Sequence, residues 1–151
     1  MPAFDPPDPD FAERVRRSFA RQRLLATLGA TLDRVAPGEV DIRLPFREDL
    51  AQQHGFLHAG AITSIVDTAC GYAALTLMPA GAAVLSVEFK LNLLSPGRGE
   101  SFVARARVKR PGRTVTVVTG DVFALQGGEE RLVATMLATM MTLLGRSGLE
   151  G

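Results

Sequence analysis

The chain has 151 residues, a formal net charge of +1 and an apolar fraction of 46%, enough for one domain with a substantial core. The balanced charge gives no electrostatic signature of nucleic-acid or membrane-surface binding. The single cysteine, Cys70, excludes an internal disulfide and fits a reducing compartment. No segment reaches the roughly 20 uncharged apolar residues of a membrane span, and the first residues lack the pattern of a signal peptide. We therefore expect a cytoplasmic protein with one domain over residues 1–151 and neither nucleic-acid nor membrane partners.

The two ends of the chain differ from its middle. Residues 1–9 are rich in proline and aspartate, and we expect them and residues 145–151 to be flexible. Asp10 can cap a helix that continues to about Leu28, with Gly29 as its stop. The core of the domain should then span about residues 30–143.

Alternation of apolar and polar residues predicts five strands. They are Val40–Leu44, Ala83–Leu94, Phe102–Lys109, Thr114–Leu125 and Leu132–Leu143. In the second strand, the alternation puts Leu85, Val87, Phe89 and Leu91 on one face and Ser86, Glu88, Lys90 and Asn92 on the other. Because short glycine and proline turns connect the last four strands, we expect these strands to be antiparallel.

One long helix, from about Gly60 to Met78, is almost wholly apolar. A helix that is apolar on every side is normally buried, and this one can be buried only if the sheet curls around it. The sequence therefore predicts an α+β fold: an antiparallel sheet wrapped around one long central helix, with an additional N-terminal helix.

The start of this helix carries two histidines and two small residues: His54, His58, Ala59 and Gly60. The first N–H groups of a helix have no internal partner and, with the helix dipole, favour negative charge. Small residues let a substrate carbonyl approach the backbone closely. These are the properties of an oxyanion hole.

Asp67 is a carboxylate inside the apolar helix. Because burial of an unpaired carboxylate is costly, we expect Asp67 to have a chemical role. The alternative is a carboxylate that only bonds the nearby hydroxyls of Thr63, Ser64 or Thr68. Asp67 lies seven residues after Gly60, about 10 Å along the helix axis. One copy is thus poorly built to bring both groups to one atom, whereas a two-fold dimer could bring Asp67 to the partner's helix start.

Other polar residues leave more than one interpretation open. His58 and His54 could contact substrate or water, or could serve only as scaffolding. Their spacing also suggests a metal, but no third ligand is evident, and we expect none. Cys70 lies inside the apolar helix without a paired histidine, so we expect an inert thiol. The basic residues between Arg110 and Thr114 are typical of a solvated face, although turn N–H groups beside them could hold phosphates.

Two segments of the chain resemble a known family. They are Gln-His-Gly-Phe-Leu-His-Ala-Gly, followed by a helix with Val-Asp-Thr-Ala, and Leu-Ser-Val-Glu-Phe-Lys-Leu-Asn-Leu-Leu-Ser-Pro. Together they resemble the hot-dog-fold acyl-CoA thioesterases of the phenylacetate-degradation (PaaI-like) group, over about residues 30–143. The resemblance implies hydrolysis of the thioester of acyl- or aroyl-CoA, with coenzyme A as part of the substrate and no other cofactor. It also implies a homodimer with shared active sites, often paired into a homotetramer.

The resemblance also assigns roles to single residues. Asp67 would be the nucleophile or the base for water, and Ser86 would support it. The N–H of Ala59, beside Gly60, would polarise the carbonyl, while Gln52, next to Gln53, would help to place water or substrate. The CoA phosphates would lie along the turn formed by Arg110, Gly112, Arg113 and Thr114.

The chain departs from the family pattern at two positions. The usual His-Gly-Gly is His58-Ala59-Gly60 here, and the added methyl group keeps the N–H donor but narrows the approach. The common upstream asparagine is Gln52, which moves the amide by one methylene. Two other functions fit the same fold: a non-catalytic acyl-CoA-binding regulator, and a hydratase or dehydratase that uses His58 with Asp67.

Overall fold

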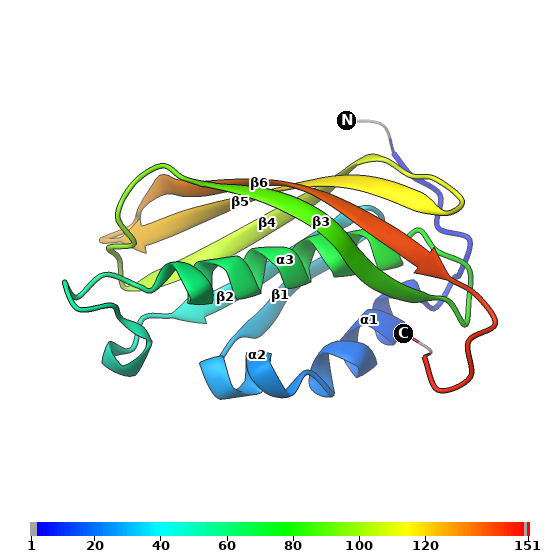
Figure 1. Cartoon of the computed structure of the whole chain (residues 1–151), viewed down its shortest axis with the longest axis horizontal. Coiled ribbons are helices and arrows are strands. Elements are labelled where there is room, and N and C mark those ends of the chain that lie inside the picture. The colour runs from blue at the N-terminus through cyan, green and yellow to red at the C-terminus, as the bar shows by residue number, and fades with distance from the viewer. Residues whose placement is uncertain (1–2, 150) are drawn as a thin grey trace.

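The computed structural model describes residues 3–149 and 151, which form a curved sheet around one helix (Figure 1). The helices are α1 (Phe11–Ala20), α2 (Arg23–Leu28), the 3-10 turn η1 (Glu48–Leu50) and α3 (Ala59–Leu75). The strands are β1 (Thr31–Ala36), β2 (Glu39–Pro45), β3 (Ala83–Leu93), β4 (Ser101–Arg110), β5 (Val115–Gln126) and β6 (Glu129–Leu143). Within the described residues they form one sheet in the order β1-β2-β4-β5-β6-β3, with every pairing antiparallel. The predicted α+β fold is confirmed.

The core lies between α3 and the inner face of the sheet, where α3 packs against β2 to β6. Gly120 lets β5 pass close to the helix. A Cβ atom at this position would lie 2.5 Å from Val66 Cγ2 and 2.9 Å from Cys70 Sγ. Burial raises the pKa of the Cys70 thiol well above its ordinary value, with smaller contributions from the charges of Asp67 and Asp121. The thiol therefore stays protonated, as its place in the sequence predicted.

The predicted N-terminal helix is in fact two helices. Gln22, between α1 and α2, has an extended backbone with φ −75° and ψ 99°, which interrupts the helix. Gly29 ends α2 as predicted, in the left-handed conformation with φ 79°. The break turns α2 so that Leu25 and Leu28 are buried in the core.

The strand β1 has no counterpart in the sequence prediction. Its burial pattern does not alternate, and its pairing with β2 shifts register between Leu32 and Arg34. The period-two signal on which a strand prediction depends is therefore absent there.

Part of the N-terminal segment packs on the domain instead of standing away from it. Phe4 contacts the core, and Asp8 is buried beside Arg14, 3.4 Å from its guanidinium. At the other end, the N–H of Gly151 donates to the carbonyl of Ala82 at 3.1 Å. Residues 1, 2 and 150, for which flexibility was also predicted, lie outside the described residues.

A β-bulge in β3 makes the predicted assignment of residues to its two faces wrong. The register between β3 and β6 shifts between Ser86 and Glu88, so Val87 is an extra residue at that point. Beyond the bulge, Phe89 and Leu91 pair with Ala138 and Met136, residues of β6 that are buried against the helix. Ser86 pairs with Met140, which is buried on the same inner face. Ser86 therefore shares a face with Phe89 and Leu91, whereas simple alternation had put it on the opposite face.

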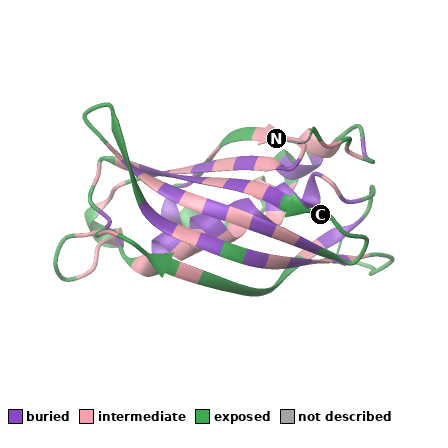
Figure 2. Cartoon of the chain, turned by 90° about the horizontal axis from the view of Figure 1, so that it is seen from above, coloured by how far each residue is buried: buried purple, intermediate pink, exposed green. Residues whose placement is uncertain are grey.

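The outer edge of β3 is unpaired and carries several exposed apolar side chains. Leu85, Phe89 and Leu93 are 54%, 41% and 53% exposed. Figure 2 shows this edge strand green over most of its length, whereas the inner strands alternate between purple and pink. A long apolar strand edge is a surface that favours pairing with another strand.

The helix α3 ends at Leu75, earlier than predicted, and Arg14 from α1 holds that end. The buried Arg14 guanidinium donates to the carbonyls of Leu75, Met78 and Pro79 at 2.7, 2.9 and 2.6 Å. The last turn of α3 contains no basic residue of its own. Burial lowers the pKa of Arg14, and the charge of Asp8 opposes that shift. Arg14 therefore satisfies the open carbonyls and complements the helix dipole from another element.

Replacement of Arg14 by methionine should lower the free energy of unfolding by about 3 kcal/mol, because buried carbonyls and Asp8 lose their partner. The measurement is urea unfolding followed by circular dichroism. Arg16→Met is the control, since Arg16 is exposed on the same helix, and should change stability by about 0.5 kcal/mol or less. Equal losses in the two variants would contradict the capping role.

Candidate active site

His58 is the N-cap of α3 and fixes the start of the helix. Its Nδ1 accepts a hydrogen bond from the N–H of Gly60 at 2.7 Å, and its carbonyl accepts from Ala61 and Ile62. Because Nδ1 is an acceptor, the neutral ring carries its proton on Nε2. The scaffolding interpretation of His58 is therefore the one that the geometry supports, and the Gly60 N–H is already engaged.

The N–H group of Ala59 remains open. Ala59 is the first residue of α3, so its N–H has no partner within the helix. The hydrogen bonds recorded among residues 3–149 and 151 include no acceptor for it. Of the two predicted oxyanion donors, Ala59 is thus the one that can receive a ligand.

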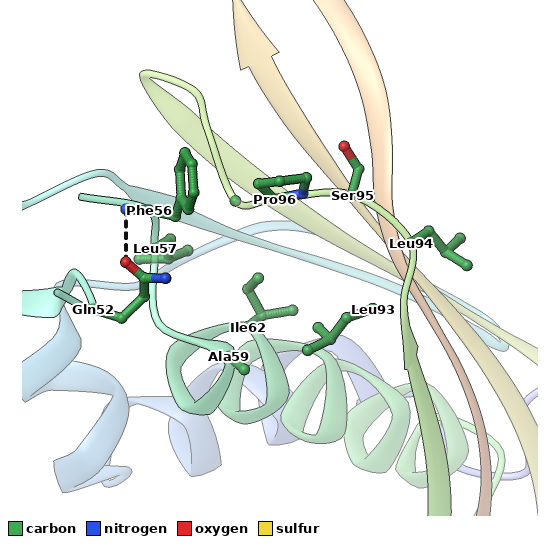
Figure 3. A pocket seen from close by; sticks show the side chains of 10 residues that line it. Gln52, Phe56, Leu57, Ala59, Ile62, Leu93, Leu94, Ser95 and Pro96 are labelled. Carbon is green, nitrogen blue, oxygen red and sulfur yellow. Dashed lines mark hydrogen bonds between the residues drawn. The ribbon is translucent and has the colours of Figure 1, made fainter. Parts of the chain in front are cut away.

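A cavity of about 400 Å³ lies against this helix start (Figure 3). Its lining comes from the loop before α3, from α3 itself, and from the end of β3 with the loop that follows it. The lining residues are Gln52, Phe56, Leu57, Ala59, Ile62 and residues 93–97. Most of these side chains are apolar, so a ligand held there would be shielded from water next to the Ala59 N–H.

Gln52 has its carboxamide oriented by the backbone. Its Oε1 accepts from the N–H groups of His54 and Phe56 at 2.5 and 3.3 Å. The oxygen is thereby identified as the acceptor, and the amide nitrogen lies on the cavity side (Figure 3). Gln52 can therefore donate into the cavity, whereas the neighbouring Gln53 and the His54 side chain are exposed and outside its lining.

Asp67 lies inside the mostly buried helix α3, and its carboxylate is half-buried in the single chain. The sheet leaves one side of α3 uncovered, where Asp67 lines a separate cavity of about 100 Å³. The Ser86 hydroxyl donates to Asp67 Oδ1 at 2.7 Å. The hydroxyls of Thr63 and Ser64, the alternative partners, instead donate to the helix carbonyls of Ala59 and Gly60.

The bulge in β3 is what makes the pair of Asp67 and Ser86 possible. The extra residue Val87 puts Ser86 on the inner face, toward α3. Bulges commonly re-aim a side chain next to a functional site. The carboxylate is therefore oriented by a hydroxyl from a different element and remains accessible from outside the chain.

The structure does not bring Asp67 and Ala59 together within one chain. They are eight residues apart on one straight helix, which corresponds to about 12 Å along its axis. Their two cavities share no lining residue. Within one chain, the open N–H group and the carboxylate therefore face two separate cavities.

The basic turn formed by Arg110, Gly112, Arg113 and Thr114 is also distant from the Ala59 cavity. This turn joins β4 to β5 near the C-terminal end of α3, whereas the Ala59 cavity lies at the opposite end of the same chain (Figure 1). All four residues are exposed. Their role with CoA phosphates stays a prediction.

The sequence interpretation missed the contribution of the loop after β3. The carbonyl of Gly97 accepts from the N–H of Leu57 at 2.8 Å, which ties this loop to the segment before α3. The Arg98 guanidinium stacks 5.0 Å from the centre of the Phe56 ring at the edge of the cavity. The Ser-Pro-Gly sequence predicted a turn. No local sequence pattern indicated that the turn would bind the distant Leu57.

Comparison with known proteins identifies the family. The model of the thioesterase superfamily matches residues 54–130, so the chain belongs to that superfamily. The structure of a thioesterase family protein from Silicibacter pomeroyi is 55% identical, with a TM-score of 0.88, and the match covers 89% of this chain and 99% of that one. The chain is thus a hydrolase of a family that cleaves thioesters.

Two further relatives agree. A candidate esterase from Halobacterium salinarum is 32% identical over 73% of this chain and 76% of its own length. A candidate thioesterase from Ralstonia eutropha, named as a phenylacetic acid degradation-related protein, is 25% identical with a TM-score of 0.74, over 87% of this chain and 98% of that one. The predicted resemblance to hot-dog thioesterases of this group is confirmed.

The described residues hold neither a membrane-spanning helix nor a metal-binding cluster. No helix there is long and apolar enough to cross a membrane. Among the same residues, no group of three or more His, Cys, Asp or Glu side chains is placed to hold a metal ion.

Replacement of Ala59 by proline should remove the open N–H and leave the helix intact. Proline is favoured at the first helical position, and His58 already has the φ of −61° and ψ of 138° that a residue before proline requires. We expect kcat for thioester hydrolysis to fall about 10²-fold, with the melting temperature nearly unchanged. Ala59→Gly, which keeps the N–H, is the control; an unchanged kcat in folded Ala59→Pro would exclude this donor.

Proposed function

We propose that this protein hydrolyses the thioester bond of acyl-CoA or aroyl-CoA to give the free acid and CoA. The observation that carries the proposal is the Asp67 carboxylate, which Ser86 orients at 2.7 Å and which opens into a cavity on the uncovered side of α3. Membership of the thioesterase superfamily supplies the reaction class. The acyl-CoA substrate and the residue roles are our proposal.

The active site is completed by a second copy of the chain. The apolar outer edge of β3 favours antiparallel pairing with the same edge of a partner. If the two-fold axis passes between Glu88 and Phe89, Leu93 of one copy lies opposite Val84 of the other. Leu93 lines the Ala59 cavity and Val84 lines the Asp67 cavity. This pairing therefore joins the Asp67 half of one copy to the Ala59 half of the other.

The same two-fold arrangement gives a place to the predicted CoA-phosphate turn. The axis reverses the partner, so the C-terminal end of its α3 and its turn between Arg110 and Thr114 lie at the same end of the dimer as the first copy's helix start. The two arginines and the turn N–H groups suit phosphate oxygens. Pairing of such dimers into a tetramer is part of the proposal.

The mechanism assigns each group one task. In the general-base form, Asp67 takes a proton from water as the water oxygen attacks the thioester carbonyl carbon. The carbonyl oxygen becomes an oxyanion and accepts a hydrogen bond from the partner's Ala59 N–H, at the positive end of the helix dipole. Gln52, which lines the same cavity as that Ala59, donates to the substrate or water. The carbon–sulfur bond then breaks, and the CoA thiolate takes up the proton that Asp67 removed from water. In the alternative nucleophilic form, the Asp67 carboxylate attacks the carbonyl carbon and expels the CoA thiolate. Water then hydrolyses the resulting anhydride to the free acid, which restores the Asp67 carboxylate, and the thiolate takes up the released proton.

A hydratase role for His58 is less well supported. That chemistry needs a free imidazole nitrogen as base, but Nδ1 of His58 accepts the cap hydrogen bond from Gly60. The Nε2 atom of the same neutral ring then carries the proton. His58 is therefore better suited to hold the helix start than to abstract a proton.

Replacement of Asp67 by alanine should lower kcat by about 10²-fold or more, because the base or nucleophile is lost. The assay follows free thiol release from a panel of aliphatic and aromatic acyl-CoA esters. Asp67→Asn, which can still accept from Ser86, separates loss of the charge from loss of the hydrogen bond. Wild-type rates in Asp67→Ala would rule out the mechanism. Calorimetric binding of CoA esters without turnover by the wild-type protein would instead indicate a binding protein.

A further inference from the structure

The small cavity beside Asp67 has walls from three different parts of the chain. Gln22 lies at the break between α1 and α2, Val84 and Ser86 belong to β3, and the remaining lining residues belong to α3. The α3 residues are Asp67, Thr68, Gly71 and Tyr72. Its volume of about 100 Å³ corresponds to roughly three water molecules. The N-terminal helices thus close one side of the cavity that holds the reactive carboxylate.

Gly71 is the unusual member of this lining. It lies inside α3, one turn after Asp67, where glycine is the least favourable residue apart from proline. A Cβ atom built at Gly71 meets no heavy atom within 4 Å. At Gly120, by contrast, the helix itself would clash with an added side chain. The described part of the chain therefore gives no packing reason for a glycine at position 71, and the space above it is open.

The open space continues beyond Asp67 toward the N-terminal helices. A second cavity, of about 220 Å³, shares Gln22, Tyr72 and Val84 with the first. Leu75 and Ala83 add apolar surface to it. The Tyr72 hydroxyl is held by Ser18 of α1 at 3.0 Å, so the tyrosine wall has a fixed position. The two cavities thus adjoin, and together they outline a path from the carboxylate to a more apolar region.

We infer that this path is the acyl subsite: the acyl chain of the substrate passes over Gly71 and ends between Tyr72 and the break at Gln22. The inference rests on the proposed function. The pantetheine arm then occupies the larger cavity of about 400 Å³ at the partner's helix start. In each chain, Arg98 at the rim of that cavity supplies positive charge that matches the CoA phosphates. Gly71 and Gln22 are thus specificity-determining residues that limit the length of the acyl group.

The test is the substitution Gly71→Leu, which adds a side chain at a position where a Cβ atom would meet no heavy atom within 4 Å. The probes are straight-chain acyl-CoA esters from acetyl-CoA to decanoyl-CoA. We expect kcat/KM for the longer esters to fall about 10-fold or more, since one misfitting methylene group in a pocket costs 10- to 200-fold. The value for acetyl-CoA should change less than about threefold, and inhibition by free CoA should not change. Gln22→Trp, from the opposite wall, should shift the profile in the same direction.

Ala26→Leu is the matched control, because Ala26 is exposed on α2 and lines neither cavity. This variant should keep the wild-type profile. Weaker inhibition by free CoA in Gly71→Leu, with an unchanged acyl profile, would overturn the inference and assign the path to CoA. Loss of the dimer in size-exclusion chromatography would also overturn it, since Gly71 would then serve subunit contact. An unchanged profile in both cavity variants would refute the subsite alone, whereas absence of hydrolysis by the wild-type protein would refute the proposed function.

Discussion

The rigidity of one helix governs the whole site. The open N–H of Ala59 and the carboxylate of Asp67 are fixed on α3 about 12 Å apart along its axis. No side-chain rotation brings both to the same carbonyl group. The proposed catalytic arrangement therefore requires a second copy, and the unpaired edge of β3 is the surface on which we propose that this copy pairs. In this proposal the sheet has two tasks: it buries the helix, and its edge strand β3 presents the joining edge.

The elements around α3 explain why its position is well defined. Arg14 holds the C-terminal carbonyls from α1, and His58 caps the N-terminus. Gly120 permits close contact between β5 and the middle of the helix. The bulge at Val87 then turns Ser86 toward Asp67, the carboxylate on the side of α3 that the sheet leaves uncovered. The Ala59 N–H and the Asp67 carboxylate are therefore positioned by backbone features, the Gly120 contact and the bulge, together with the side chains of Arg14, His58 and Ser86.

Much of this arrangement could be predicted from the sequence, and the exceptions have physical causes. The long apolar run of α3 and the alternation in β2 to β6 located these elements, and the motif around His58 pointed to the candidate site. The break at Gln22 was missed because an amphipathic pattern continues across it. The predicted face of Ser86 was wrong because the prediction assumed an unbroken alternation, whereas a single extra residue inverts it. The contact between Gly97 and Leu57 joins residues forty positions apart, which no local signal reports.

The most direct test of the account is a mixed dimer of Asp67→Ala and Ala59→Pro chains, purified through two different affinity tags. In the shared arrangement, one of the two sites combines the intact Asp67 of one chain with the intact Ala59 of the other. The mixed dimer should then recover about half of the wild-type kcat per dimer, although each parent homodimer is nearly inactive. A mixed dimer as inactive as its parents would contradict a site shared between two chains.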